Sequence, residues 1–225
     1  MSLDLARIRA LCFDVDGTLS DSDDYYVGRL AGWMKHVPLV PNRERIARRL
    51  VMWMESPANA LFGLADGLGL DTEVITVIDW MQRHRKTHAR GLPVIPGVAD
   101  LLQKVHLRYP LAIVSARDQD STMAFLKQAN LVQYFDVIVT ALSAKHTKPY
   151  PDPIVLAAQR IEVAPDSCLM IGDTSVDIRA GRAAGAQTVG VLCGYGEAAE
   201  LQRQGADLIL QTTADLDGAL FGLRQ

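Results

Sequence analysis

Two carboxylates stand at the end of the first apolar run of the chain. The run RALCFDV covers residues 9–15, and it leads into the segment Asp14-Val-Asp16-Gly-Thr. Alternate residues of an extended segment point the same way, so both carboxylates can face one crevice. Such oxygens suit hard cations, but a calcium loop is excluded, because its sixth position needs Gly and is Leu19 and its twelfth needs Glu and is Tyr25. The simpler alternative is an acidic turn that faces solvent.

A second acidic pair follows another apolar run. Asp173 comes directly after CLMIG, and Asp177 stands one helical turn later. In the simpler interpretation Thr174 caps a helix and Asp177 interacts favourably with the helix dipole. Those roles leave unexplained why a second strand of the same sheet ends in an acidic residue.

Two further residues offer complementary groups. Ser115 ends the run LAIVS, where a hydroxyl at a helix N-terminus can hold a phosphate oxygen. Lys148 stands in KPYPDP, where three prolines stiffen the chain around one amine. Each also has an ordinary explanation, since Ser115 could cap the helix and Lys148 could be a solvated loop residue.

The elements that must position these groups alternate along the chain. Short runs rich in Val, Ile and Leu are apolar at both odd and even positions, which is typical of strands covered on both faces. We expect strands at 9–15, 111–115, 135–140, 168–171, 188–192 and 207–210, and helices at about 97–109, 118–130, 152–162, 175–185 and 213–222. This alternation predicts an α/β fold with a doubly wound, Rossmann-like parallel sheet.

One block interrupts the alternation. From about Ser20 to Pro93 no strand-like run occurs, and the spacing of apolar residues is helical. We therefore expect an α/β core formed by residues 1–19 and 94–225, and a helical domain, residues 20–93, inserted after the first strand.

Composition narrows the class of protein. Apolar residues make up 49% of the 225 residues, charged residues make up 22%, and the net charge is −3. This is ordinary globular composition, with no general attraction for nucleic acid or an anionic membrane. No apolar run reaches the ~18 residues of a membrane span, and the three scattered cysteines suggest reduced thiols. We expect a cytoplasmic protein with no membrane or nucleic-acid partner, either monomeric or homodimeric.

The four motifs together resemble those of a known family. Asp-x-Asp-Gly-Thr, a Ser at a strand end, a Lys before Pro, and Gly-Asp-x-x-x-Asp occur in this order in the haloacid dehalogenase (HAD) superfamily, and the resemblance covers residues 9–19 and 97–222. An insert after the first motif is similar to the cap domain of that superfamily. DGTLSDS, KPYPDP, DIRAGRAAGA, VLCGYG and QGADLIL look closest to the phosphoglycolate-phosphatase-like branch.

The resemblance implies a site and a mechanism. Asp14 would be the nucleophile that forms an aspartyl-phosphate, and Asp16 would be the general acid and base. Mg²⁺ would be held by Asp14, the backbone carbonyl of Asp16 and Asp173, with Asp177 in the outer shell orienting Lys148 or a metal-bound water. The residues expected to hold the phosphate are Thr18, Ser115, Ala116 and Lys148.

The expected function is Mg²⁺-dependent hydrolysis of a small phosphorylated metabolite, such as a phosphoglycolate-like compound or a sugar phosphate. Dehalogenases of this superfamily lack the second acid, so Asp16 favours phosphoryl transfer. An inorganic pyrophosphatase and a phosphosugar mutase of the same fold stay open as alternatives. So does a non-catalytic binding protein built on this scaffold.

Overall fold

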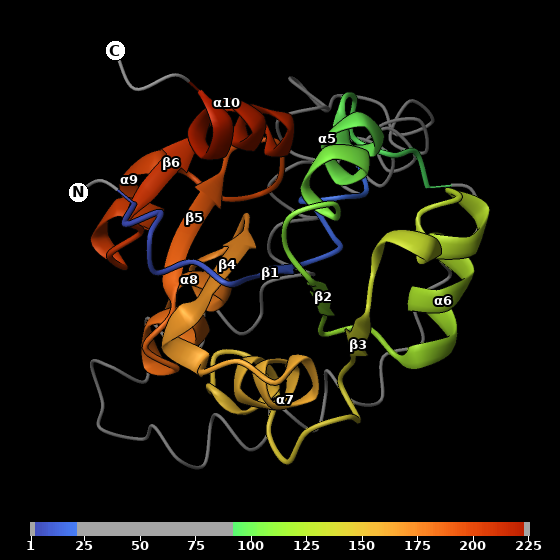
Figure 1. Cartoon of the computed structure of the whole chain (residues 1–225), viewed down its shortest axis with the longest axis horizontal. Coiled ribbons are helices and arrows are strands. Elements are labelled where there is room, and N and C mark those ends of the chain that lie inside the picture. The colour runs from blue at the N-terminus through green and yellow to red at the C-terminus, as the bar shows by residue number, and fades with distance from the viewer. Residues whose placement is uncertain (1–2, 22–91, 223–225) are drawn as a thin grey trace, which may run out of the picture.

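Six short apolar runs form one sheet in which every strand is parallel to its neighbours. The protein is described by a computed structural model that covers residues 3–21 and 92–222 (Figure 1). The strands are β1 (Ala10–Phe13), β2 (Leu111–Val114), β3 (Val137–Val139), β4 (Cys168–Gly172), β5 (Gln187–Val191) and β6 (Leu208–Leu210). Residues of β1, β2, β4 and β5 are buried at odd and even positions alike, as expected for a sheet covered on both faces.

The strand order places the first strand in the middle of the sheet. The order is β3-β2-β1-β4-β5-β6, so β1 pairs with β2 on one side and with β4 on the other. The connections wind away from β1 in both directions, and the point of reversal lies between β1 and β4. In open parallel sheets a crevice forms beyond the carboxyl ends of the strands at such a point.

The helices lie on both faces of this sheet (Figure 1). They are α5 (Val98–Val105), α6 (Gln119–Gln128), α7 (Asp152–Ile161), α8 (Ser175–Ala183), α9 (Ala198–Arg203) and α10 (Leu216–Phe221). One apolar cluster joins side chains of α5, α6 and α10 to one face, including Phe13 of β1. A second cluster joins α7 and α8 to the other face, including Cys12. The predicted doubly wound α/β core is therefore confirmed.

The boundaries differ from the expected ones in a few places. The helix expected at 97–109 ends at Val105, and a turn follows in which the Arg108 and Tyr109 amides both donate to the Val105 carbonyl. The helix expected at 213–222 begins as a 3₁₀ turn and becomes α10 at Leu216. Helix α9 was not predicted, because it is six residues long and buries a single side chain, Leu201.

The two ends of the predicted insert are joined to each other. The Asp21 amide donates to the Pro93 carbonyl at 2.9 Å, and the Ile95 amide donates to the Leu19 carbonyl at 2.9 Å. Ser20 and Val94 form an antiparallel bridge between them. Nearly all of the expected helical domain, residues 20–93, lies outside the described residues, so that domain stays a prediction.

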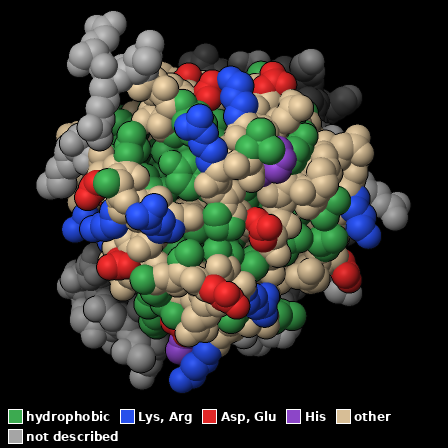
Figure 2. All heavy atoms as spheres, in the orientation of Figure 1, with side chains coloured by type: hydrophobic (Ala, Val, Ile, Leu, Met, Phe, Trp, Pro, Cys, Tyr) green, Lys and Arg blue, Asp and Glu red, His purple; other side chains and the backbone are tan. Residues whose placement is uncertain are grey.

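The surface carries no strong concentration of one charge on the face seen in Figure 2. Basic and acidic side chains are interspersed there among apolar and neutral ones, in keeping with the net charge of −3. Among the helices in residues 3–21 and 92–222, none is both long and apolar enough to cross a membrane.

Candidate active site

Three neighbouring strands end in the predicted site residues. Ser115 follows β2, Asp14 follows β1 and Asp173 follows β4. The Asp14 amide donates to the Ile171 carbonyl at 2.9 Å, and the Ser115 amide donates to the Val139 carbonyl at 3.0 Å, so ladder hydrogen bonds fix the strand ends. Parallel pairing therefore brings groups that are far apart in the sequence to one edge of the sheet.

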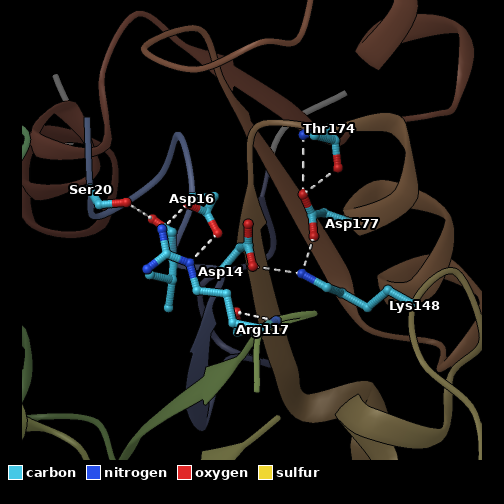
Figure 3. Close-up of polar contacts among 9 residues, drawn as sticks. Asp14, Asp16, Ser20, Arg117, Lys148, Thr174 and Asp177 are labelled. Carbon is cyan, nitrogen blue, oxygen red and sulfur yellow. Dashed lines mark hydrogen bonds and ion pairs between the residues drawn. The ribbon is translucent and has the colours of Figure 1, made fainter. Parts of the chain in front are cut away.

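Lys148 connects two of the carboxylates. Its Nζ donates to Asp14 Oδ1 at 2.7 Å and to Asp177 Oδ1 at 2.6 Å (Figure 3). The Lys148 side chain is only 4% exposed. A solvated loop lysine, the simpler interpretation of the sequence, is therefore wrong.

Asp177 is occupied on both of its oxygens. Oδ1 accepts from Lys148, while Oδ2 accepts from the Thr174 amide at 3.1 Å and from Thr174 Oγ1 at 2.7 Å. Thr174 is the N-cap of α8, as the simpler interpretation expected, and Asp177 is the third residue of that helix. Asp177 thus belongs to the helix cap and also orients Lys148, which agrees with an outer-shell role.

Burial and neighbouring charges shift the protonation equilibria of this group. Burial, with smaller contributions from Asp177 and Asp16, raises the pKa of Asp14 to about 7, although Lys148 opposes this. For Lys148, burial alone lowers the pKa, but Asp14 and Asp177 outweigh burial and raise the pKa above its usual value. The site therefore disfavours an extra negative charge and retains a permanently charged lysine.

Asp173 lies beneath two tight loops. It is fully buried, and its Oδ2 accepts from the Tyr195 amide at 2.8 Å. A Cβ on Gly17, whose φ is +67°, would lie 2.3 Å from this oxygen, and a Cβ on Gly194 would lie 2.1 Å from it. Only glycine lets both loops approach Asp173 this closely.

The carboxylates fit a hard divalent cation. One oxygen each from Asp14, Asp173 and Asp177 lies within 4.8 Å of the others, and all three residues are buried. Clustered carboxylate oxygens suit Mg²⁺, which is bound by few protein oxygens and keeps several waters. A cation would also offset the burial and the neighbouring negative charges that together raise the pKa of Asp14. The Asp16 carboxylate is not part of this cluster; the expected ligand was its carbonyl.

Asp16 instead pairs with an arginine. Arg117 Nε and Nη2 donate to Asp16 Oδ2 and Oδ1, so the guanidinium engages both oxygens of the carboxylate. Figure 3 shows Asp14 between this pair and the pair of Lys148 with Asp177. Arg117 was not predicted as a site residue. Its place two positions after Ser115 is the only hint in the sequence, because its partner lies 101 residues away.

The residues expected to hold phosphate have different surroundings. Ser115 is buried, and its Oγ accepts from the Arg117 amide at 3.2 Å. It is not the helix cap, since Asp118 caps α6 by accepting from the Ser121 amide at 2.8 Å. Thr18 is fully buried, and among the described residues its Oγ1 has no hydrogen-bond partner. Ala116 lies between Ser115 and Arg117 and is half-buried.

Several known proteins have sequences similar to that of this chain. A family model described as haloacid dehalogenase-like hydrolase matches residues 11–191. The phosphoglycolate phosphatase of Escherichia coli is 29% identical over 240 residues, which cover 95% of this chain and 92% of that protein. A pyrophosphatase of Bacillus velezensis is 28% identical and covers 93% of this chain and 95% of its own length.

A solved structure agrees in fold. A HAD family hydrolase from Deinococcus radiodurans, crystallised with bound phosphate and sodium, has a TM-score of 0.73 and 26% identity, with 96% of each chain covered. Together these findings confirm the resemblance to the phosphoglycolate-phosphatase-like branch and the expected class, a phosphatase. The chain belongs to the haloacid dehalogenase-like hydrolase family.

Proposed function

We propose that this enzyme is a Mg²⁺-dependent phosphatase that hydrolyses a small phosphorylated metabolite through an aspartyl-phosphate on Asp14. One observation carries the proposal. At the end of the central strand, Asp14 is buried, bonded to Lys148 at 2.7 Å and clustered with Asp173 and Asp177. A nucleophilic carboxylate is suited to attack on phosphorus when a lysine ammonium lies beside it and neighbouring carboxylates can bind a metal ion.

The first half of the reaction transfers the phosphoryl group to the protein. An oxygen of Asp14 attacks phosphorus, and the bond between phosphorus and the leaving oxygen breaks. Asp16 gives its proton to that oxygen, which departs as an alcohol. The products of this half are the aspartyl-phosphate and an ionised Asp16.

The second half returns the enzyme to its starting state. A water attacks phosphorus, its proton passes to Asp16, and the bond between phosphorus and the Asp14 oxygen breaks. Inorganic phosphate leaves, and Asp14 is again a carboxylate. Lys148 and Ser115 would hold phosphate oxygens in both halves, with backbone amides of the loop that contains Asp16 and Gly17.

The metal would be held by Asp14, Asp173 and the Asp16 carbonyl, while Asp177 holds Lys148 from the outer shell. When bound, Mg²⁺ supplies positive charge that lets the anionic nucleophile and the anionic phosphate approach one another. Lys148 contributes a second, permanent positive charge beside the nucleophile.

Two substrate classes follow from the relatives. The similarity to the Escherichia coli phosphoglycolate phosphatase supports a small phosphomonoester such as a phosphorylated hydroxy acid or sugar. The similarity to the Bacillus velezensis pyrophosphatase supports inorganic pyrophosphate as the second candidate. We favour the phosphomonoester, because Asp16 can supply the proton that an alkoxide leaving group requires.

The test is a panel of phosphomonoesters and pyrophosphate, assayed with Mg²⁺ and after removal of metal by EDTA. We expect turnover of a phosphomonoester that is lost in EDTA and returns with Mg²⁺. Asp14→Asn keeps the shape of the side chain but removes the attacking charge, so turnover should fall at least ~10³-fold. Asp120→Asn changes an exposed aspartate on α6 and should leave turnover unchanged.

Three results would contradict the scheme. The first is full activity in EDTA, and the second is an Asp14→Asn enzyme that keeps more than about a tenth of the rate. The third is transfer of the phosphoryl group to a second hydroxyl of the substrate instead of to water, which would identify a mutase.

A further inference from the structure

We propose that Thr213 is a positioning residue for the β1 turn, the six residues 15–20 that follow Asp14 and include Asp16. The inference starts from one buried hydrogen bond, in which Thr213 Oγ1 donates to the Thr18 carbonyl at 2.6 Å across 195 residues of sequence. It rests on the proposed function and deepens it, since Thr213 lies outside the four motifs of the site.

The β1 turn is closed by its own backbone. The Leu19 and Ser20 amides both donate to the Val15 carbonyl at 2.9 Å. The Gly17 amide donates to the Ser20 carbonyl, also at 2.9 Å, and Ser20 Oγ donates to the Val15 carbonyl at 3.2 Å. The turn is therefore one compact unit, and a shift of one of its carbonyls should shift Asp16 as well.

Three successive carbonyls of the β1 turn accept hydrogen bonds from outside it. The three pairs are Gly17 with Cys193 Sγ at 3.4 Å, Thr18 with Thr213 Oγ1 at 2.6 Å, and Leu19 with the Ile95 amide at 2.9 Å. The first two donors are side chains that follow β5 and β6, so substitution can remove them. The Thr213 hydroxyl is the stronger of these two, because a thiol is a weak donor.

Thr213 is itself fixed before it contacts the turn. Its side chain is fully buried. It begins the 3₁₀ turn before α10, where Thr212 Oγ1 accepts from the Ala214 amide at 3.0 Å and the Thr212 amide donates to Asp215 Oδ2 at 3.0 Å. Leu216, the first residue of α10, lies in the apolar cluster. The hydroxyl is thus presented to the Thr18 carbonyl from a rigid support.

In the proposed reaction this turn supplies the Asp16 carboxylate to both halves. Asp16 is the acid in the first half and the base in the second, so every substrate depends on its place. Lys148 and Ser115, which would hold phosphate oxygens, come from other segments. Loss of the Thr213 hydroxyl should therefore slow turnover of all substrates and have much less effect on the binding of phosphate.

The test is a series of three substitutions at this position. Thr213→Ser keeps the hydroxyl, and its kcat should stay within about 2-fold of wild type. Thr213→Ala removes the donor from a buried carbonyl, and kcat should fall about 5- to 10-fold, because small misplacements of a reacting group are costly. Thr213→Val puts a methyl group where the oxygens were 2.6 Å apart, so the turn must shift and kcat should fall further.

The measurements separate positioning from stability. We would assay 4-nitrophenyl phosphate with saturating Mg²⁺, at a temperature where thermal unfolding shows every variant to be fully folded. The inhibition constant of inorganic phosphate should change less than about 3-fold in all three variants. A role in stability alone would lower the melting temperature and leave kcat unchanged.

Thr188→Ala is the matched control. Thr188 is fully buried, and its Oγ1 donates to Asp207 Oδ2 at 3.2 Å. It stands near the start of β5, whereas Cys193 follows the other end of that strand. This variant should lose stability, because a buried hydrogen bond is removed, and should keep the wild-type kcat.

Cys193→Ala tests the second support of the same turn. Cys193 Sγ lies 3.4 Å from the Gly17 carbonyl and 3.5 Å from Thr213 Oγ1. Because the thiol is the weaker donor, kcat should fall only about 2- to 3-fold. Should Thr213→Val fail to fold, Thr213→Ala and Cys193→Ala carry the comparison with Thr188→Ala.

A wild-type kcat in Thr213→Ala would overturn the inference, whatever its melting temperature. So would a Thr213→Ser variant as slow as Thr213→Ala, or a phosphate inhibition constant that rises in proportion to the loss of rate. These results leave the phosphatase activity itself standing. A wild-type enzyme that hydrolyses neither 4-nitrophenyl phosphate nor any phosphomonoester of the panel would instead overturn the proposed function, and this inference with it.

Discussion

Asp14 occupies surroundings that work against its own negative charge. Burial and two neighbouring carboxylates raise its pKa to about 7, despite the ion pair with Lys148. In the proposed mechanism, Asp14 would be fully ionised near neutral pH only with more positive charge beside it. A bound cation would therefore act on this residue as well as on the substrate.

This predicts an effect of Asp14 on stability. Folding raises the pKa of Asp14 from 3.8 to about 7. The folded state is therefore more stable at low pH, where Asp14 is protonated, and this stability is lost as the pH rises through about 7. In EDTA at pH 8, Asp14→Asn should therefore be more stable than wild type by on the order of 2 kcal/mol. The difference should shrink as the pH falls toward 5.

Urea unfolding at several pH values measures this difference. Asp120→Asn should show no such gain at pH 8, since Asp120 is exposed. Added Mg²⁺ should reverse the order, because a ligand of the folded state stabilises only the protein that binds it well. An Asp14→Asn variant that is less stable than wild type at pH 8 in EDTA would contradict the electrostatic account of the site.

At the scale of elements, the loop after β5 packs directly against the carboxylate of Asp173. Gly194 and Tyr195 lie in this loop, and the Tyr195 amide bonds the carboxylate at 2.8 Å. A Cβ added at Gly194 would lie 2.1 Å from Asp173 Oδ2 and 2.5 Å from its carboxyl carbon. Such contacts cannot form, so either the loop or the carboxylate must move.

Gly194→Ala should therefore weaken the response to metal. We expect the Mg²⁺ concentration for half-maximal activity to rise at least ~10-fold, as is typical when the partners of a metal ligand are disturbed. Gly218→Ala is the matched control, because a Cβ there meets nothing within 4 Å. It lies inside α10 and should stabilise the protein by about 0.5–1 kcal/mol without changing the Mg²⁺ response. An unchanged Mg²⁺ response in Gly194→Ala would show that this loop does not position Asp173.

The elements were largely predictable, and for an identifiable reason. Strands covered on both faces are continuous apolar runs, and the six strands were found from that pattern, although the residues of the edge strand β6 are only half-buried. Helix α9 was missed because Leu201 is its single buried residue, so it carries no apolar periodicity. The end of α5 was misplaced because the sequence does not show how far before Pro110 a helix stops.

From strand pattern alone, the site was predictable to the level of strand ends, and the place of Lys148 came from the resemblance to the family. Parallel pairing brings Asp14, Asp173 and Ser115 together wherever their strands are neighbours. The pairing of Arg117 with Asp16 depends instead on side-chain conformation, and periodicity says nothing about that. For the same reason the sequence left open whether Ser115 caps the following helix, a role that belongs to Asp118 in the structure.

At the scale of the whole molecule, the feature most relevant to function is the junction between the core and the predicted insert. Backbone hydrogen bonds join Leu19 to Ile95 and Asp21 to Pro93. The chain therefore leaves the core and returns to it at neighbouring points, close in sequence to Asp16. A segment attached in this way can cover the site and contact the part of the substrate beyond the phosphate. We expect the residues between these points to set substrate preference.

Replacing residues 22–91 by a short Gly/Ser linker tests this expectation. The core keeps its sheet, its two apolar clusters and the bonded junction, so it should still unfold cooperatively. Its kcat/KM for the preferred metabolite should fall much more than its kcat/KM for 4-nitrophenyl phosphate, and the remaining activity should still require Asp14. A core that keeps the full ranking of substrates would show that specificity lies elsewhere.

The central place of β1 also affects the order in which the chain assembles. β1 is synthesised before both of its partners, and β2 and β4 follow at roughly a hundred residues or more. Until they arrive, its backbone groups have no ladder to join, and pairing over such distances is slow. Once the junction has formed, at its own entropic cost, the effective loop between β1 and β2 is shorter by roughly seventy residues. Closure entropy depends on the logarithm of loop length, so the later pairing of β1 with β2 then costs about 1 kcal/mol less. A large segment can thus be carried between the first two strands with little delay to the assembly of the sheet.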